Sequence, residues 1–567
     1  MRFLVVSACF LSVCAADIQF DIRLIPKVDS ALPVFSLGSP AVIPQQLLSQ
    51  FVNNTAPGAE LRRGFGAQYA FDGNRLVALV NETTGETKIF PTLRNLRPAG
   101  YINTSLAFEY LRNEQIFPKD DTNFTVTNGS SLLGSTYKNG TKPTSPKAYL
   151  SHAWVQRNIT VGEQHYPVCG PGGKASFGFA ADGSVHSLTH LWKPARLTSR
   201  VVRSIPRDCV YHNIIKQLES IGDNGLIRVK SVEVCFYDSG ANFLQPVYRF
   251  DAQFGPDVTN STNATTAGIQ GFIPLGNSAL EPITDLTNRE PRPAPAPAAP
   301  FPFPASPQSI LSQERQFQPQ IKVGRYIDRN VASVNPGYTQ WYQNSWSFID
   351  GLWESQIFPF GSNKVDFIDS QYLWAYPYQF TSDKESYVDS VHIADTEVHG
   401  NWHVFWTLYN TGDLVFLSDI PASGYGGGAG GSLAYWILHS CEVISTLIDY
   451  SAADSYEAWA VWWSIFNGLH AVVGYRTEMQ IADGVTGPFG LYIGLGAAVV
   501  SSWLTIVHDT ALYVPAILDN ENPNGIYEPE GRAAAVAVCG HGDDIVTDIE
   551  NLGRPDCLEM WWYDNSY

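Results

Sequence analysis

Two short motifs in the C-terminal half carry residue types suited to nucleophilic chemistry. His399-Gly400 follows one strand-like stretch, and Cys441 follows a second, fully apolar one. A thiolate is a strong nucleophile, and an imidazole can take its proton and later return it to a leaving amine. The two side chains need to be close in space, not in sequence. We therefore predict a dyad of His399 and Cys441.

Neighbouring residues extend this hypothesis. Gly400 has no Cβ, so its backbone N–H can approach a substrate carbonyl and, with the N–H of Cys441, form an oxyanion hole. Acidic side chains near a peptide-cleaving site select basic residues in the substrate. We take Asp395, Asp419 and Glu442 as candidate substrate-binding acids.

The elements that must position the dyad follow an α/β pattern. Apolar runs of the kind found in buried parallel strands alternate with helix-like stretches. In open α/β sheets, functional residues gather at the carboxyl ends of the strands. We expect strands at 390–394, 414–417, 433–438 and 470–475, and helices at 458–466 and 491–507. The predicted C-terminal domain is thus α/β with a mainly parallel sheet.

A strand ending in His-Gly, followed about forty residues later by a buried strand ending in Cys, resembles the caspase, legumain and gingipain class of cysteine peptidases. The resemblance rests on His399, Gly400 and Cys441 and covers roughly 385–510. It also extends to a largely uncharacterised group of secreted proteins with a propeptide-like region before this domain. It implies a caspase-hemoglobinase-like fold, endopeptidase activity on a peptide or protein substrate, and no cofactor. Ser440 is the usual small residue before the Cys, but the sequence departs from the pattern at His439, which stands where an acid or Gln is usual.

The N-terminus indicates export. Residues 1–16 combine one Arg, an apolar stretch and Cys-Ala-Ala before Asp17, the pattern of a secretory signal peptide. Nine Asn-X-Ser/Thr sequons agree with a secreted, extracellular glycoprotein, and all lie before residue 266. The predicted acceptors are Asn53, Asn81, Asn103, Asn123, Asn128, Asn139, Asn158, Asn260 and Asn263.

Residues 17–286 read as a glycosylated α+β region. Gly-Pro-Gly-Gly-Lys at 170–174, a strand, the turn Asp182-Gly183 and a second strand resemble small helix-on-sheet domains in the propeptides of secreted peptidases. In such families, these domains assist folding and block the active site. The resemblance implies that the N-terminal region is a chaperone or inhibitor of the C-terminal domain.

A Pro-rich linker is predicted at 287–320, before an acidic domain at 321–567. Prolines at alternate positions favour an extended chain. Residues 321–567 hold 8 Lys and Arg against 30 Asp and Glu, a net charge of −22, whereas residues 1–320 carry +4. Opposite charges on tethered domains favour intramolecular docking, although two independent domains remain the alternative. The overall charge of −18 argues against a nucleic-acid partner.

Other interpretations of these residues stay open. His399 and His403 are spaced as a zinc pair, but Gly400 disfavours the helix that such a pair needs, so we expect no metal. The uncharged stretch 484–507 is long enough to span a membrane, but its glycines and Pro488 favour a buried helix, so we expect no stable membrane span. A non-catalytic extracellular glycoprotein that binds a protein or carbohydrate is the alternative function, motivated by 15 Trp.

The cysteines bear on both functions. Cys539 and Cys557 are the favoured disulfide pair. If Cys441 is a free nucleophile, one of Cys169, Cys209 and Cys235 has no partner. A disulfide at Cys441 would instead favour the binding function.

Overall fold

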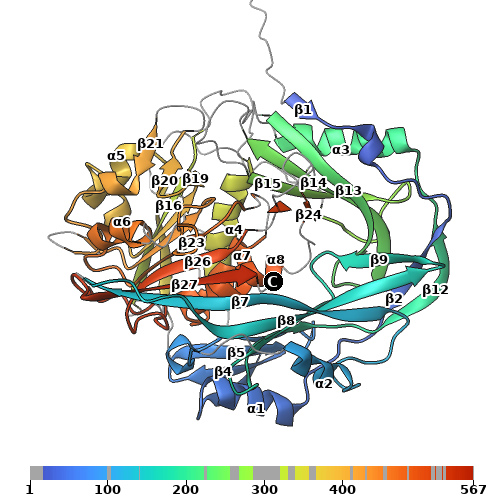
Figure 1. Cartoon of the computed structure of the whole chain (residues 1–567), viewed down its shortest axis with the longest axis horizontal. Helices are drawn as coiled ribbons and strands as arrows, with labels where there is room; N and C mark the ends of the chain where they lie inside the picture. The colour runs from blue at the N-terminus through green and yellow to red at the C-terminus, as the bar shows by residue number, and fades with distance from the viewer. Residues whose placement is uncertain are drawn as a thin grey trace, which may run out of the picture.

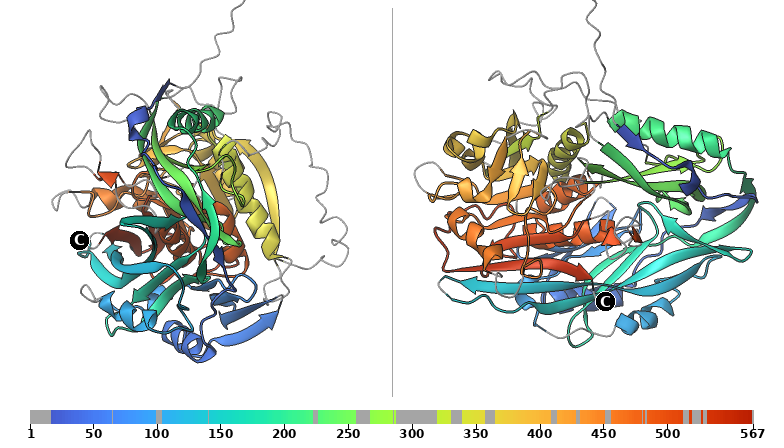
Figure 2. Two further views of the ribbon diagram at one scale, coloured as in Figure 1. Left: turned by 90° about the vertical axis from the view of Figure 1, so that its right-hand side faces the viewer. Right: turned by 45° about the horizontal axis from the view of Figure 1, so that its top comes forward.

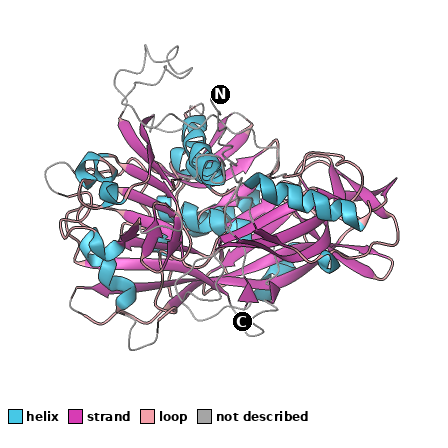
Figure 3. Ribbon diagram, turned by 90° about the horizontal axis from the view of Figure 1, so that it is seen from above, coloured by secondary structure: helices cyan, strands magenta, loops and turns pink. Residues whose placement is uncertain are grey.

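The chain forms a sheet-rich α/β protein with few helices and a mixed sheet (Figure 3). The signal-peptide and linker predictions lie almost wholly outside the described residues. The computed structural model describes residues 17–64, 66–98, 104–139, 141–221, 226–255, 267–284, 286, 319–329, 339–356, 365–408, 413–427, 431–450, 456–479, 481, 484–511, 517–518, 526–527 and 531–565.

Five parallel strands form the centre of the C-terminal half. Their order is β17–β16–β18–β22–β23. Two antiparallel strands, β26 and β27, continue the sheet beyond β23. The bounds are β16 (Gln320–Ile327), β17 (Asp366–Trp374), β18 (Ile393–Glu397), β22 (Tyr435–His439), β23 (Ala471–Tyr475), β26 (Ala533–Val538) and β27 (Cys557–Asn565).

Both faces of this sheet are covered, as its apolar strands require. Helices α4 (Thr339–Ser355), α7 (Thr486–Gly494) and α8 (Val499–Ala511) pack on one face. Helices α5 (Pro377–Phe380) and α6 (Glu457–Ile465) pack on the other (Figure 1).

The prediction of a single helix over 491–507 is wrong, because the helix is interrupted between α7 and α8. Gly496 has φ +96°, and its carbonyl accepts a hydrogen bond from Leu76 N–H at 2.8 Å. Only glycine adopts this conformation readily. Each helix is therefore short, and no helix among the described residues has the length and apolar character needed to cross a membrane.

The two halves share one sheet. The C-terminal strand β27 pairs antiparallel with the N-terminal-half strand β7 (Asn123–Lys138), from Cys557 opposite Lys138 to Asn565 opposite Ser130. Strand β8 (Lys147–Val161) follows β7, and both run across the molecule between the C-terminal sheet and the elements β4, β5 and α1 (Figures 1 and 2). The boundary predicted between 17–286 and 321–567 is thus crossed by continuous backbone pairing.

Shorter strands extend this sheet from β8 and carry helix α1 (Gln45–Thr55) against them. Their order is β8–β10–β11–β6–β5–β4–β3. The bounds are β3 (Glu60–Gly64), β4 (Ala67–Asp72), β5 (Arg75–Asn81), β6 (Thr87–Ile89), β10 (Lys174–Phe179) and β11 (Val185–Leu191).

A second sheet completes the N-terminal half, with helix α3 (Arg207–Ile221) packed on it. Strand β13 pairs with β1, β9 and β14, and β14 also pairs with β2 and β15. The bounds are β1 (Asp17–Gln19), β2 (Leu32–Leu37), β9 (Gln164–Cys169), β12 (Ala195–Val202), β13 (Leu226–Asp238), β14 (Phe243–Gly255) and β15 (Ala267–Pro274).

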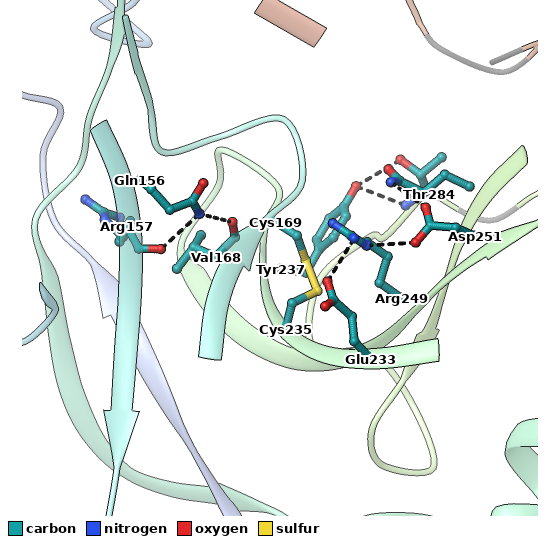
Figure 4. Close-up of a disulfide and its surroundings, with 11 residues drawn as sticks. Gln156, Arg157, Val168, Cys169, Glu233, Cys235, Tyr237, Arg249, Asp251 and Thr284 are labelled. Atoms are coloured by element: carbon teal, nitrogen blue, oxygen red, sulfur yellow. Dashed lines mark hydrogen bonds and ion pairs between the residues drawn. A yellow bond between two sulfur atoms is a disulfide. The ribbon is translucent and has the colours of Figure 1, made fainter. Parts of the chain in front are cut away.

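Two disulfides brace the fold. Cys169 on β9 is joined to Cys235 on β13, next to Tyr237 (Figure 4). Cys539 is joined to Cys557, the pair favoured from the sequence. Among the described cysteines, Cys209 and Cys441 are left as free thiols. Of the six cysteines after residue 16, four are therefore paired, and Cys441 is one of the two that are not.

Candidate functional site

The parallel register of β18 and β22 brings the two predicted motifs together. Glu397 lies opposite His439 in this pair. Three residues beyond Glu397, the backbone of Gly400 packs against the segment after β22: a β-carbon on Gly400 would lie 2.1 Å from Ser440 Oγ and 2.7 Å from the Cys441 carbonyl oxygen. His399-Gly400 and Ser440-Cys441 are therefore neighbouring segments at the carboxyl edge of the sheet, where α/β proteins place their sites.

The histidine motif was expected at the end of a strand, but the structure places it at the start of another one. After β18 the chain enters a separate antiparallel sheet of β19 (His399–Asn401), β20 (Val404–Trp406) and β21 (Leu414–Phe416). This small sheet holds His399 at its first position. The imidazole of His399 meets the edge of Trp341 on α4, with ring centroids 5.5 Å apart.

The His403 side chain has other neighbours than the His399 side chain. It adopts φ +58°, and its ring lies 3.0 Å from Ser445 Oγ and 3.4 Å from the Tyr450 hydroxyl. Its surroundings therefore differ from those of His399, which packs on Trp341. The geometry gives no support to a zinc pair of His399 and His403.

The dyad residues are fully buried, and burial sets their protonation. Both His399 and Cys441 are 0% exposed. Burial lowers the pKa of His399 to about 3. Burial raises the pKa of Cys441 well above its ordinary value, and the nearby carboxylates of Glu478 and Glu442 act in the same direction. Both groups are thus neutral near pH 7, and the thiol is unreactive in this state.

The cover over Cys441 involves the N-terminal half. Residues Glu478 and Met479 interact with the thiol, and the backbone N–H of Met479 stabilises its charged form. The same segment is hydrogen-bonded to β15: Gly268 N–H donates to the Met479 carbonyl at 2.7 Å, and Ile481 N–H donates to the Gly268 carbonyl at 3.2 Å. Strand β15 therefore holds in place the segment that interacts with the Cys441 thiol.

A buried polar cluster, which the sequence did not predict, lies at the ends of β18 and β22. His439 Nδ1 and Glu397 Oε2 are 2.6 Å apart, and both side chains are 0% exposed. Asn344 on α4 donates to the Ile481 carbonyl at 2.8 Å and lies beside the same imidazole. The sequence signal was available, since Glu397 and His439 both end their strands and so share one register position.

The three predicted substrate-binding acids occupy different surroundings. Asp395 on β18 is 0% exposed, so it cannot meet a substrate in this state, and burial raises its pKa to about 6. Asp419 is exposed on the turn η9 (Leu417–Asp419). Glu442 directly follows Cys441, and burial together with Glu478 raises its pKa to about 7. Glu442 is the one placed beside the thiol.

The described sequons lie at accessible or partly accessible positions, with no sugar assigned to any of them. Asn53, Asn123 and Asn139 are exposed, and Asn81 and Asn158 are partly buried. Asn103, Asn260, Asn263 and the side chain of Asn128 lie outside the described residues.

A separate cavity of about 850 Å³ opens between the two halves. It is lined by both acidic and basic side chains, including Lys174, Asp350 and Glu354, with Tyr492 at its wall. Burial lowers the pKa of Lys174 to about 8, and Lys88 adds to this effect. The cavity has both polar and apolar walls and is roomy enough for a small molecule.

Comparisons with known proteins give a family match for one part of the chain and no activity. A family model described as "Domain of unknown function (DUF6345)" matches residues 365–518, which include His399, Gly400 and Cys441. No curated protein matches the chain. Among solved structures, the chain is similar to an uncharacterized protein from Eubacterium rectale ATCC 33656, at 8% identity and a TM-score of 0.27, over 47% of this chain and 90% of that one.

Proposed function

We propose that this protein is a secreted cysteine peptidase-like hydrolase with a caspase-hemoglobinase-like C-terminal domain, held here in a latent state. The observation that supports it is the close packing of His399-Gly400 against Ser440-Cys441 beyond two adjacent parallel strands. The N-terminal half then acts as the inhibitor of this site, because its strand β15 is hydrogen-bonded to Met479 in the segment that would cover Cys441.

The proposed chemistry uses only side chains of this chain. The His399 imidazole takes the Cys441 Sγ proton, and the thiolate attacks the substrate carbonyl carbon. Backbone N–H groups of Gly400 and Cys441 stabilise the oxyanion. The amine leaves with the proton from His399, and water then hydrolyses the thioester to release the acid and regenerate the thiol.

The expected substrate carries basic residues near the scissile bond. Glu442 and Glu478 both raise the pKa of Cys441, so their carboxylates act on the reacting thiol. A basic substrate side chain between them would lower the pKa of the thiol and favour the thiolate. Displacing the segment at Met479 would admit both water and substrate, which the latent state excludes.

The test is activity-based labelling of the full chain. A peptidyl acyloxymethyl ketone with Arg beside the reactive group is applied before and after limited proteolysis, with peptide cleavage measured in parallel. Labelling at Cys441 should appear only after proteolysis, and Cys441→Ala should abolish both labelling and cleavage. Cys209→Ala is the matched control. Cleavage retained by Cys441→Ala, or no Cys441 labelling in any proteolysed form, would reject the proposal.

A non-catalytic extracellular binding protein is the second candidate, and the cavity between the halves favours it. Its mixed charges and its Tyr237, Phe272 and Tyr492 rings suit a polar ligand with an apolar face, such as a sugar. The tryptophans offer less support than their number suggests, since seven are among the largest fully buried side chains. Glycan-array binding that survives Cys441→Ala but is lost in Glu354→Gln would favour this function.

A further inference from the structure

A second cluster of histidine and carboxylate groups lies at the opposite edge of the parallel sheet. His470 immediately precedes β23, so it marks the amino end of that strand, whereas Cys441 lies beyond the carboxyl end of its neighbour β22. His470, His541 and Asp544 each place one potential ligand atom in this cluster, all within 4.8 Å of one another. No step of the proposed hydrolysis uses these residues.

The hydrogen bonding of His470 selects the ring nitrogen that faces the cluster. Its Nε2 lies 2.7 Å from the Glu550 carbonyl oxygen, which can only accept, so Nε2 carries a proton. In a neutral imidazole the lone pair is then on Nδ1, which points at Asp544 Oδ2 from 2.6 Å. A backbone carbonyl that fixes the tautomer in this way is the usual support of a metal-binding histidine.

His541 approaches the same carboxylate oxygen. Its Nδ1 lies 2.7 Å from Asp544 Oδ2. One carboxylate oxygen therefore lies between two imidazole nitrogens, at a site where the side chain of His470 is 0% exposed. A divalent cation bound there would take the place of the protons that these nitrogens otherwise share with Asp544.

The framework around the cluster is rigid. The loop between β26 and β27 begins at Cys539, which its disulfide ties to Cys557. Within the loop, His541 N–H donates to the Val538 carbonyl at 2.9 Å, and Val538 N–H donates to the His470 carbonyl at 3.0 Å. The Tyr435 hydroxyl donates to the Ile545 carbonyl at 2.7 Å. The ligands are thus held by backbone contacts rather than by flexible termini.

We propose that His470 Nδ1, His541 Nδ1 and Asp544 Oδ2 bind one Zn²⁺ ion, with water as the fourth ligand. Two imidazole nitrogens and one carboxylate oxygen match the three-ligand sites that zinc occupies with an open position. The open position faces solvent, since the side chains of His541 and Asp544 are 34% and 19% exposed. Ligand atoms of tetrahedral zinc are about 3.3 Å apart, so the side chains must open by about 0.6 Å from their present contacts.

Zinc binding to the chelator-treated full chain tests the proposal. Competition with a chromophoric zinc chelator should give one tight site per chain, and Co²⁺ should give the intense visible bands of a tetrahedral site. His541→Ala and Asp544→Asn should each weaken zinc affinity at least ten-fold and abolish those bands. His212→Ala, an exposed histidine on α3, should leave both unchanged.

Folding is followed in every variant by circular dichroism, and the partly exposed His541 is the variant expected to stay folded. A wild-type chain that takes up no stoichiometric zinc overturns the proposal and leaves a purely hydrogen-bonded cluster. Zinc binding that is equal in the wild type and in folded His541→Ala overturns it as well. Neither result depends on whether Cys441 is catalytic.

Discussion

Gly400 and Ser440 are in direct contact: a β-carbon on Gly400 would lie 2.1 Å from the Ser440 hydroxyl oxygen. This contact joins the histidine and cysteine motifs, which are about forty residues apart in sequence. It also explains the requirement for glycine after His399, since Val443 Cγ2 lies only 2.4 Å from the same point. Two buried segments therefore meet here with no space for a side chain.

We expect Gly400→Ala to lower the free energy of unfolding by about 3 kcal/mol, because overpacked sites must shift their neighbours. Gly487→Ala on α7 is the matched control, because its β-carbon would make an ordinary contact of 3.5 Å with Ser347. Urea unfolding measures both. Equal stability of the two variants would contradict the close packing of Gly400 against Ser440.

The Glu397–His439 pair should be costly to break from one side. Both partners are fully buried and 2.6 Å apart, so Glu397→Gln leaves the imidazole without its carboxylate. We expect a loss of about 3 kcal/mol in the free energy of unfolding. Glu385→Gln removes the half-exposed partner of Lys384, which keeps its buried partner Asp389, so this change should cost less than about 1 kcal/mol. Similar losses in chemical denaturation would show that the buried pair has no special role.

The two free thiols should differ sharply in reactivity in the latent protein. Cys209 is exposed, whereas Cys441 is buried with a raised pKa. We expect iodoacetamide at pH 8 to modify Cys209 at least a hundred times faster, because Cys441 offers neither access nor thiolate. Peptide mapping by mass spectrometry follows each site, and denaturant should equalise them. Comparable native rates would show that the dyad is open.

Asp395 gives a prediction for pH. Burial raises its folded-state pKa from 3.8 to about 6, against the opposing effects of Ser345, His439 and Arg325. A raised carboxyl pKa stabilises the protonated folded state, so this contribution is complete below pH 3.8 and is lost as the pH rises through 6.

The neutral variant Asp395→Asn should therefore gain stability relative to the wild type between pH 4 and pH 7. The gain should be up to about 3 kcal/mol, as a two-unit pKa difference implies. Thermal unfolding of both proteins across this range measures the difference in their stability. The other titratable groups are the same in both proteins, so their contributions cancel. A constant difference between the two proteins would mean that Asp395 is not titrating there.

The parallel strands were predictable because a fully apolar run such as 433–438 is typical of a strand that is buried on both faces of a sheet. The approach of the His399-Gly400 segment to the Ser440-Cys441 segment was also within reach, since neighbouring strand ends share an edge. The segment at Met479 was not, because its hydrogen bonds with Gly268 join residues about 210 apart in the sequence. Local sequence has no periodicity that reports such a contact.

The helix break at Gly496 shows a similar limit. An uncharged stretch with helical composition favours one helix, but the carbonyl of Gly496 is needed by Leu76, far away in the chain. The sequence likewise did not associate His470 with His541 and Asp544, because the strand β26 lies between them. Tertiary contacts decided each of these features.

The pairing of β27 with β7 has a consequence for processing. A protease that cut between residues 286 and 319 would yield two polypeptides that stay interlocked through nine residue pairs of backbone ladder. Such a nicked protein would migrate as one species in native chromatography and as two bands in denaturing electrophoresis. Maturation, if it occurs there, would rearrange the protein without releasing either piece.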